Sequence, residues 1–123
     1  MKSIFKLFGN EADPELKKLQ LHNLCMESGN LPDIEKLVEQ GFSLENTDAK
    51  GRTPLFIALE YGQFEYFAYL LEKGANPNVQ DEDGVTCLNI GKSSSGYAEF
   101  IELLLQHGAD PNLKDKHGKT YLM

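Results

Sequence analysis

The sequence predicts an all-α solenoid of about three helix-turn-helix units, followed by a partial C-terminal unit. This prediction rests on two glycine series that repeat in phase and on apolar residues that recur with helical spacing between them. Both series have spacings of 33 and 34 residues, and they comprise Gly41, Gly74 and Gly108, then Gly51, Gly84 and Gly118. Two short helices cannot bury their apolar faces alone, so each unit must be stabilised by stacking on its neighbours.

The expected helical pairs span residues 14–41, 53–74 and 86–108. The second helix of each pair carries apolar residues along one face, which we expect to be core. These faces comprise Leu31, Ile34, Leu37 and Val38; Phe64, Phe67, Leu70 and Leu71; and Ala98, Ile101, Leu104 and Leu105. Next to the core face of the second unit, Tyr66 and Tyr69 are expected to be half-buried.

Prolines mark three helix starts, at Asp13-Pro14, Leu31-Pro32 and Thr53-Pro54. Pro suits the first turn of a helix, and we expect the Thr53 hydroxyl to help open the helix that follows. A glycine follows each second helix, as a left-handed C-terminal cap requires. The segments 46–51 and 80–84 are polar and end in glycine, which predicts turns between the units.

The chain has 123 residues, the size of one domain. Hydrophobic residues make up 41% and charged residues 25%, which is typical of a globular protein. The formal net charge of −7 disfavours nucleic acid and anionic membranes as partners, because both require a basic surface. No apolar run has the length of a signal peptide or a membrane span, and two cysteines cannot form a disulfide framework. We therefore expect a cytoplasmic protein with reduced thiols.

Two kinds of motif resemble those of the ankyrin-repeat family. The segment Thr53-Pro54-Leu55-Phe56-Ile57-Ala58 resembles the family motif Thr-Pro-Leu-His-x-Ala. Both 74–78 (Gly-Ala-Asn-Pro-Asn) and 108–112 (Gly-Ala-Asp-Pro-Asn) resemble its second motif. Where the family usually has His, this chain has Phe56, Asn89 and Met123, which predicts less rigid turns.

The resemblance implies an ankyrin-repeat solenoid over residues 14–123, after an N-terminal extension at 1–13. Its units are expected at about 14–47, 48–80 and 81–114, with a partial unit at 115–123. In the extension, the apolar segment Ile4–Phe8 is expected to cap the first unit.

Motifs that would carry catalysis or bind cofactors are incomplete. The sequence Gly91-Lys92-Ser93 resembles the end of a phosphate-binding loop, but Thr86 stands where that loop begins with glycine. The acidic run 81–84 lacks the outer ligands of a calcium loop. His22 and Cys25 are three residues apart on one expected helix, but no second ligand pair accompanies them, so we expect Cys25 to be a buried thiol. We expect a protein that is not an enzyme and that holds no metal or cofactor.

Positions that differ from unit to unit are not fixed by stacking, and the resemblance implies that they line a concave face and loop tips that bind protein partners. The candidate partner-binding residues are Thr47, Ala49, Lys50, Arg52, Glu60, Tyr61, Gln80, Glu82, Asp83, Val85, Ser93, Ser94, Lys114, Lys116, His117 and Lys119. The expected function is a non-catalytic adaptor or inhibitor, monomeric on its own. Two alternatives stay open: an immunity-type protein that neutralises a basic toxin or enzyme, and a fragment of a larger ankyrin scaffold.

Charge along this surface is uneven. Residues 41–83 contain 3 basic and 8 acidic residues, whereas residues 84–123 contain 4 of each. An acidic centre flanked by lysines would steer a basic protein partner toward the surface. Its members are Glu60, Asp81, Glu82 and Asp83, flanked by Lys114, Lys116 and Lys119. The alternative is an acidic surface that serves solubility.

Overall fold

The computed structural model describes residues 18–92 and 96–121, and the regular elements of these residues are all helices. They form three pairs: α3 (Gln20–Leu24) with α4 (Leu31–Glu39), α5 (Pro54–Glu60) with α6 (Phe64–Glu72), and α7 (Cys87–Lys92) with α8 (Ala98–Gln106). The prediction of an all-α solenoid is confirmed. The extension at 1–13 and the helix start at Asp13-Pro14 lie outside the described residues, as do Ser93, Ser94 and Met123.

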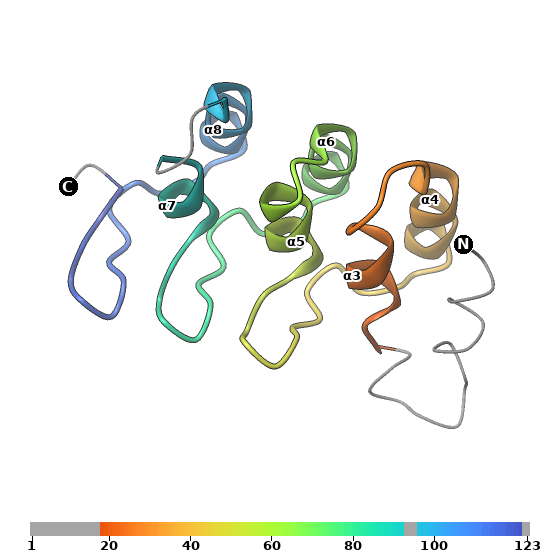
Figure 1. The fold of residues 1–123 in the computed structure, drawn as a ribbon, viewed down its shortest axis with the longest axis horizontal. Coiled ribbons are helices and arrows are strands. Elements are labelled where there is room, and N and C mark those ends of the chain that lie inside the picture. Colours follow the sequence, from red (N-terminus) through yellow and green to blue (C-terminus); the bar gives the residue numbers. More distant parts are fainter. Residues whose placement is uncertain (1–17, 93–95, 122–123) are drawn as a thin grey trace.

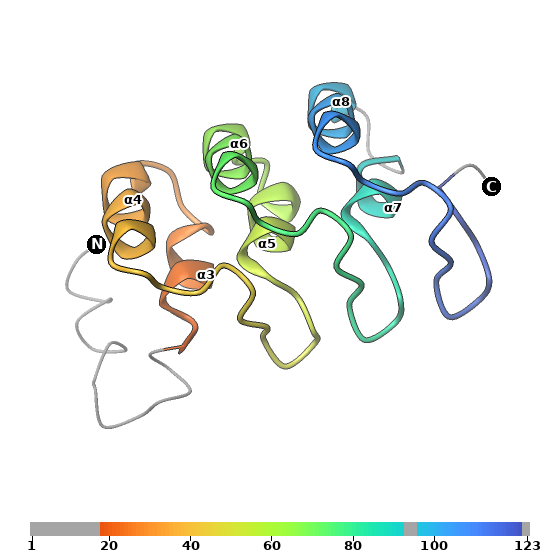
Figure 2. The ribbon, with the colours of Figure 1, turned by 180° about the vertical axis from the view of Figure 1, so that it is seen from behind.

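The helices lie in two rows, with α3, α5 and α7 in the inner row and α4, α6 and α8 in the outer row (Figure 1). Within each row, every helix contacts its counterpart in the next unit, and each inner helix also contacts its own outer helix. Three long turns project in the same direction from the inner row, and the view from behind shows them side by side (Figure 2). The repeat in the sequence is therefore a repeat in space.

The central inner helix, α5, is apolar on every side because neighbours surround it. Residues 54–59 are all buried, since α5 contacts α3, α6 and α7. Helices that are hydrophobic all round are stable only in such a position. The core of the protein runs along this row, from Leu21 through Ile57 to Leu88, each at most 1% exposed.

The predicted core faces of the outer helices are wrong at three positions. Phe64 is 38% and Leu105 is 45% exposed, and Ala98 is also exposed. Tyr66 and Phe100 are buried instead, because each outer helix packs on the preceding unit as well as on its own inner helix. The buried stripe is thus turned toward the preceding unit, and the ring of Phe100 packs edge-on against Phe64 and Phe67, with ring centroids 5.1 and 5.0 Å apart.

The expected cap by Thr53 is also wrong. Its side chain makes no capping hydrogen bond to α5, and its buried hydroxyl has no partner among the described residues. In the next unit Thr86 is tied to Asn89, whose Oδ1 accepts from the Thr86 N–H at 3.0 Å and from its hydroxyl at 2.9 Å. The position of Asn89 is that of Phe56, which offers no acceptor. Asn89 therefore supplies a hydrogen-bonded contact in its turn that Phe56 cannot supply, and the predicted difference in rigidity stays a prediction.

Glycines end the outer helices as predicted. Gly41, Gly74 and Gly108 have φ angles of +92°, +97° and +91°, in the left-handed region. The N–H of each donates back to the last turn of its helix, for example from Gly74 to the Leu71 carbonyl at 3.0 Å. Residues with a Cβ are strained in this conformation, so the glycine series marks where every outer helix must stop.

Candidate functional site

The three projecting turns, here called fingers, comprise residues 47–52, 80–85 and 114–119. Each is built around one aspartate. The Oδ1 atom of Asp48 accepts hydrogen bonds from the N–H groups of Lys50 and Arg52, both at 2.9 Å. Asp81 and Asp115 accept the equivalent pairs in the other two fingers. Sequence reasoning named Asp81 only as part of an acidic centre and did not name Asp48 or Asp115, although the spacings of 33 and 34 residues between the three aspartates were visible.

Neighbouring fingers are joined by their main chains. The N–H of Glu82 donates to the Lys50 carbonyl at 2.9 Å, and the N–H of Lys116 donates to the Asp83 carbonyl at 2.8 Å. A Cβ on Gly51 would lie 3.0 Å from the Glu82 nitrogen, and one on Gly84 would lie 3.0 Å from the backbone of the third finger. Only glycine permits so close an approach, so finger stacking depends on backbone groups and glycines.

A second set of contacts joins the units near the ends of the outer helices. The Glu45 carboxylate accepts from the Asn76 N–H at 2.9 Å, and the side chain of Asn78 accepts from the Asp110 N–H at 2.6 Å. Asn78 also donates to the Gly108 carbonyl at 3.2 Å. Glu45 and Asn78 occupy equivalent positions in successive units, so this position is a connector between units.

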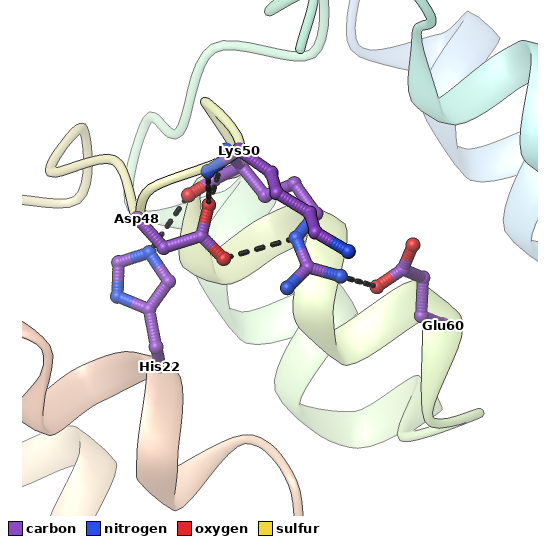
Figure 3. A network of polar contacts seen from close by, with 5 residues as sticks. His22, Asp48, Lys50 and Glu60 are labelled. Carbon is purple, nitrogen blue, oxygen red and sulfur yellow. Dashed lines mark hydrogen bonds and ion pairs between the residues drawn. The ribbon is translucent and has the colours of Figure 1, made fainter. Parts of the chain in front are cut away.

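An ion-pair network crosses the base of the first finger (Figure 3). The Arg52 guanidinium donates to Asp48 Oδ2 at 2.9 Å and to Glu60 Oε1 at 2.8 Å. Burial alone would raise the pKa of Asp48, but hydrogen bonds from backbone N–H groups and the Arg52 charge hold it below its ordinary value. Burial would lower the pKa of Arg52, and the two carboxylates raise it above its ordinary value instead. Both Arg52 and Glu60, which were predicted to bind a partner, are therefore engaged within the chain.

Other predicted residues also have internal partners. Gln80 Nε2 donates to the Lys114 carbonyl at 2.8 Å and to the Gly84 carbonyl at 2.9 Å, which links the second finger to the third. Lys116 Nζ pairs with Asp83 Oδ1 at 2.8 Å, and this hydrogen bond raises the pKa of Lys116. Two of the four acids of the expected acidic centre, Glu60 and Asp83, are thus paired with cations, whereas the Glu82 carboxylate makes no hydrogen bond or ion pair with the described residues.

The remaining predicted side chains that the structure describes form no hydrogen bond or ion pair with the described residues. Most are exposed, and Tyr61, at the end of α5, is 52% exposed. Val85 is half-buried. We call the exposed members the tip residues: Thr47, Ala49, Lys50, Tyr61, Glu82, Lys114, His117 and Lys119. Seven of the eight, all except Tyr61, lie in the fingers, and the side chains of these seven take no part in the hydrogen bonds and the ion pair that join one finger to the next.

The reactive side chains are buried in structural positions. Burial raises the pKa of Cys25 to about 12 and that of Cys87 further, so both thiols stay protonated. In residues 18–92 and 96–121, no group of three or more His, Cys, Asp and Glu side chains is placed to hold a metal ion. Within the same part of the chain, no helix has the length and apolar character needed to cross a membrane.

The buried His22 connects the first unit to the second (Figure 3). Its Nε2 lies 2.8 Å from the Arg52 carbonyl oxygen, which identifies this nitrogen as the protonated donor. Its Nδ1 is buried and has no partner among the described residues. Burial lowers the pKa of His22 below 6.5, although Asp48 opposes this effect. The pairing with the next unit, together with the neutral ring, indicates a structural role.

Stacked helical pairs with a row of fingers define a repeat protein whose fingers and inner helices present one continuous surface. A family model described as ankyrin repeats (3 copies) matches residues 2–81 and 21–115. The chain therefore belongs to the ankyrin-repeat family, which confirms the resemblance of its motifs. Repeats of this family generally mediate protein–protein interaction.

The chain is similar to parts of larger proteins. It is 32% identical to the ADP-ribosylation factor GTPase-activating protein AGD2 of Arabidopsis thaliana over 79 residues, which are 64% of this chain and 10% of that protein. It is 33% identical to the DNA-binding protein RFXANK of Homo sapiens over 86 residues, 67% of this chain and 33% of that protein. Against the ankyrin repeat domain-containing protein OPG015 of Monkeypox virus, identity is 35% over 72 residues, 58% of this chain and 14% of the relative. The chain spans about a third or less of these relatives.

Proposed function

We propose that this chain is a non-catalytic protein-binding module that holds its partner on the tip residues. The observation that carries the proposal is that main-chain groups join the fingers, whereas many of their side chains form no hydrogen bond or ion pair with the described residues. Main-chain bonds such as Glu82 N–H to Lys50 carbonyl join the fingers, while the side chains of the same residues have no internal partner in the described chain. Exposed side chains that stacking leaves unused are available for a partner.

Tyr61 supports the same surface from the inner row. It is the C-cap residue of α5 and is 52% exposed, without a hydrogen bond to the described residues. Tyrosine offers a large contact area with few rotatable bonds and is enriched among the residues that dominate binding energy. A partner that lies across the fingers and reaches the end of α5 would bury this ring.

The exposed charges of the second and third fingers have opposite signs, so each finger favours a different kind of group on the partner. Opposite the second finger, the exposed Glu82 favours a basic group. Opposite the third finger, Lys114 and Lys119 favour an acidic group. The roles of adaptor, inhibitor of a basic protein and part of a scaffold share this surface and differ in the partner that occupies it.

Site-specific photo-crosslinking tests the proposal. A benzophenone amino acid is placed at Tyr61 or Glu82 in the full chain, and at Glu65 on the outer helix α6 as the matched control. Irradiation in extract of the source cells should link the same protein to the first two positions and not to Glu65. Equal crosslinking at all three positions, or crosslinking at Glu65 alone, would show that the partner does not bind to the finger surface.

A further inference from the structure

The outward edge of the third finger repeats the groups that join the earlier fingers. The carbonyls of Lys50 and Asp83 each accept a hydrogen bond from the next finger, and His117 occupies the equivalent position. The His117 carbonyl accepts no hydrogen bond from any described residue. A Cβ on Gly118, where φ is +77°, would have no atom within 4 Å, whereas the equivalent Gly84 faces the backbone of a neighbouring finger. The edge therefore has the geometry for stacking, and no described residue stacks on it.

The connector position is repeated at the same edge. Asn112 is the equivalent of Glu45 and Asn78, whose side chains accept from N–H groups of the following unit. Asn112 is exposed, and its side chain makes no hydrogen bond within the described residues. The edge thus presents the groups that a further chain segment would need in order to continue the stack. They are the His117 carbonyl, Gly118 and the side chain of Asn112.

The charge of this edge determines which kind of partner can bind to it. Lys114, His117 and Lys119 are exposed and form no ion pair with the described residues. In the same finger, the Oδ1 atom of Asp115 accepts hydrogen bonds from the N–H groups of Lys119 and His117. These hydrogen bonds lower the pKa of Asp115. Lys116 is already paired with Asp83. On a chain of net charge −7, the two lysines give this edge positive charges that have no ion-pair partner among the described residues.

We propose that the edge formed by Asn112, Lys114, His117, Gly118 and Lys119 binds a turn from an acidic protein partner. The backbone N–H of the turn donates to the His117 carbonyl, as Glu82 does to Lys50, and its carboxylates face Lys114 and Lys119. This inference deepens the proposed function and rests on it.

A second copy of this chain fits the edge less well. Stacked in the observed register, its first finger would bring Lys50, which forms no ion pair with the described residues, toward the lysines of the third finger. Like charges placed in contact are unfavourable. An acidic turn has no such conflict, which is why we assign the edge to a partner of opposite charge.

The probe is a peptide of residues 78–86, whose sequence is Asn-Val-Gln-Asp-Glu-Asp-Gly-Val-Thr, closed into a ring by a disulfide between added terminal cysteines. It carries the acidic finger, which already makes the required backbone bond inside the chain. The full chain, labelled with ¹⁵N, is titrated with the peptide to about 1 mM, the range in which a weak site is still filled. We expect amide shifts confined to residues 112–119.

Three matched comparisons sharpen the test. Lys119→Glu should weaken peptide binding at least about fivefold, whereas Lys36→Glu, on the outer face of α4, should change it less than about twofold. A peptide methylated on the nitrogen of its central Glu should bind about tenfold more weakly, because it cannot donate to His117. A ring with lysines in place of its three acids should not bind.

The inference is overturned by the absence of shifts at about 1 mM peptide, or by shifts centred on another finger. It is also overturned if Lys36→Glu and Lys119→Glu weaken binding equally, or if the chain alone dimerises through this edge in sedimentation equilibrium. Any of these results leaves the proposed function intact as long as crosslinks form at Tyr61 and Glu82. Loss of those crosslinks removes the proposed function itself.

Discussion

The hydroxyl of Tyr66 on α6 donates a 2.6 Å hydrogen bond to the Glu27 carbonyl and accepts a 2.8 Å hydrogen bond from the Asn30 N–H. One side chain of the second unit thus satisfies two backbone groups in the turn of the first. Tyr66 is 2% exposed, whereas Asn30 is half-buried and Glu27 is exposed, so these hydrogen bonds are partly shielded from water. Units in this protein are joined by such polar contacts as well as by apolar packing.

We predict that Tyr66→Phe lowers the free energy of unfolding by about 1–3 kcal/mol, because it removes the acceptor of the Asn30 N–H and the shorter of the two hydrogen bonds to the Glu27 carbonyl. Tyr61→Phe is the control, since the Tyr61 ring is 52% exposed and makes no hydrogen bond to the described residues. Its effect should stay within about 0.5 kcal/mol. Urea denaturation followed by circular dichroism measures both, and equal effects would show that the Tyr66 bonds contribute nothing to the stack.

Leu71 and Leu105 stand at equivalent positions of α6 and α8 but differ in burial, at 2% and 45% exposed. We predict that Leu71→Ala costs about 2–5 kcal/mol, as the loss of a buried leucine does. Leu105→Ala should cost clearly less, because part of its side chain is already in water. The same denaturation experiment compares them, and a loss below about 1 kcal/mol for Leu71→Ala would place the wrong face of α6 in the core.

Much of this fold is predictable from the sequence because the repeat constrains it. The glycines after α4, α6 and α8 and the prolines at Pro32 and Pro54 fix where helices stop and start. The exposure of Phe64 and Leu105 was not predictable from the periodicity of one helix. It depends on how α6 and α8 pack against the outer helix of the preceding unit. The buried face is decided by that contact and not by periodicity alone.

The candidate surface is predictable only in part. Variation between units pointed to the fingers, and their role in partner binding stays a prediction. Such variation cannot tell a side chain that binds a neighbouring unit from one that makes no internal contact. Arg52 and Glu60 vary between units because their ion pair exists in one unit only. Variation between units could not reveal the turn-forming Asp48, because an aspartate stands at this position in every finger.

His22 makes stability depend on pH. Because burial lowers the pKa of His22 in the folded protein, the unfolded chain binds the proton more tightly. Stability from this group is present above the ordinary pKa of about 6.5 and is lost as the pH falls toward and through the lowered folded value. We predict that the free energy of unfolding decreases between about pH 6.5 and 5.

The His22→Gln variant is the control for this slope, since Gln keeps a donor toward the Arg52 carbonyl but does not titrate. Denaturation at half-unit pH steps should show a smaller slope for the variant than for the unmodified chain. Identical slopes would assign the pH dependence to other groups.

Gly84 and Gly118 test finger stacking directly, because both have a φ of +77° and only Gly84 lies against another finger. Alanine in this conformation costs about 1–2 kcal/mol at either position. At Gly84 the added Cβ also lies 3.0 Å from the backbone of Asp115 and Lys116, so we predict a further loss of about 1–3 kcal/mol. Thermal or urea unfolding measures the difference, and equal losses would contradict main-chain stacking of the fingers.

The central claim is that the main chain joins the fingers and leaves their tip side chains to a partner. The triple variant Lys50→Ala, Glu82→Ala and His117→Ala removes one tip side chain from each finger and keeps every backbone bond. Its matched control carries alanine at Glu39, Glu72 and Glu102, which are exposed on the three outer helices. Both variants should unfold within about 1 kcal/mol of the unmodified chain.

The decisive measurement is the affinity of the triple variant for the protein captured by crosslinking at Tyr61 and Glu82. We predict a loss of at least about tenfold relative to the unmodified chain, with the outer-helix control unchanged. Unchanged affinity in the tip variant, or an equal loss in the outer-helix control, would contradict the claim.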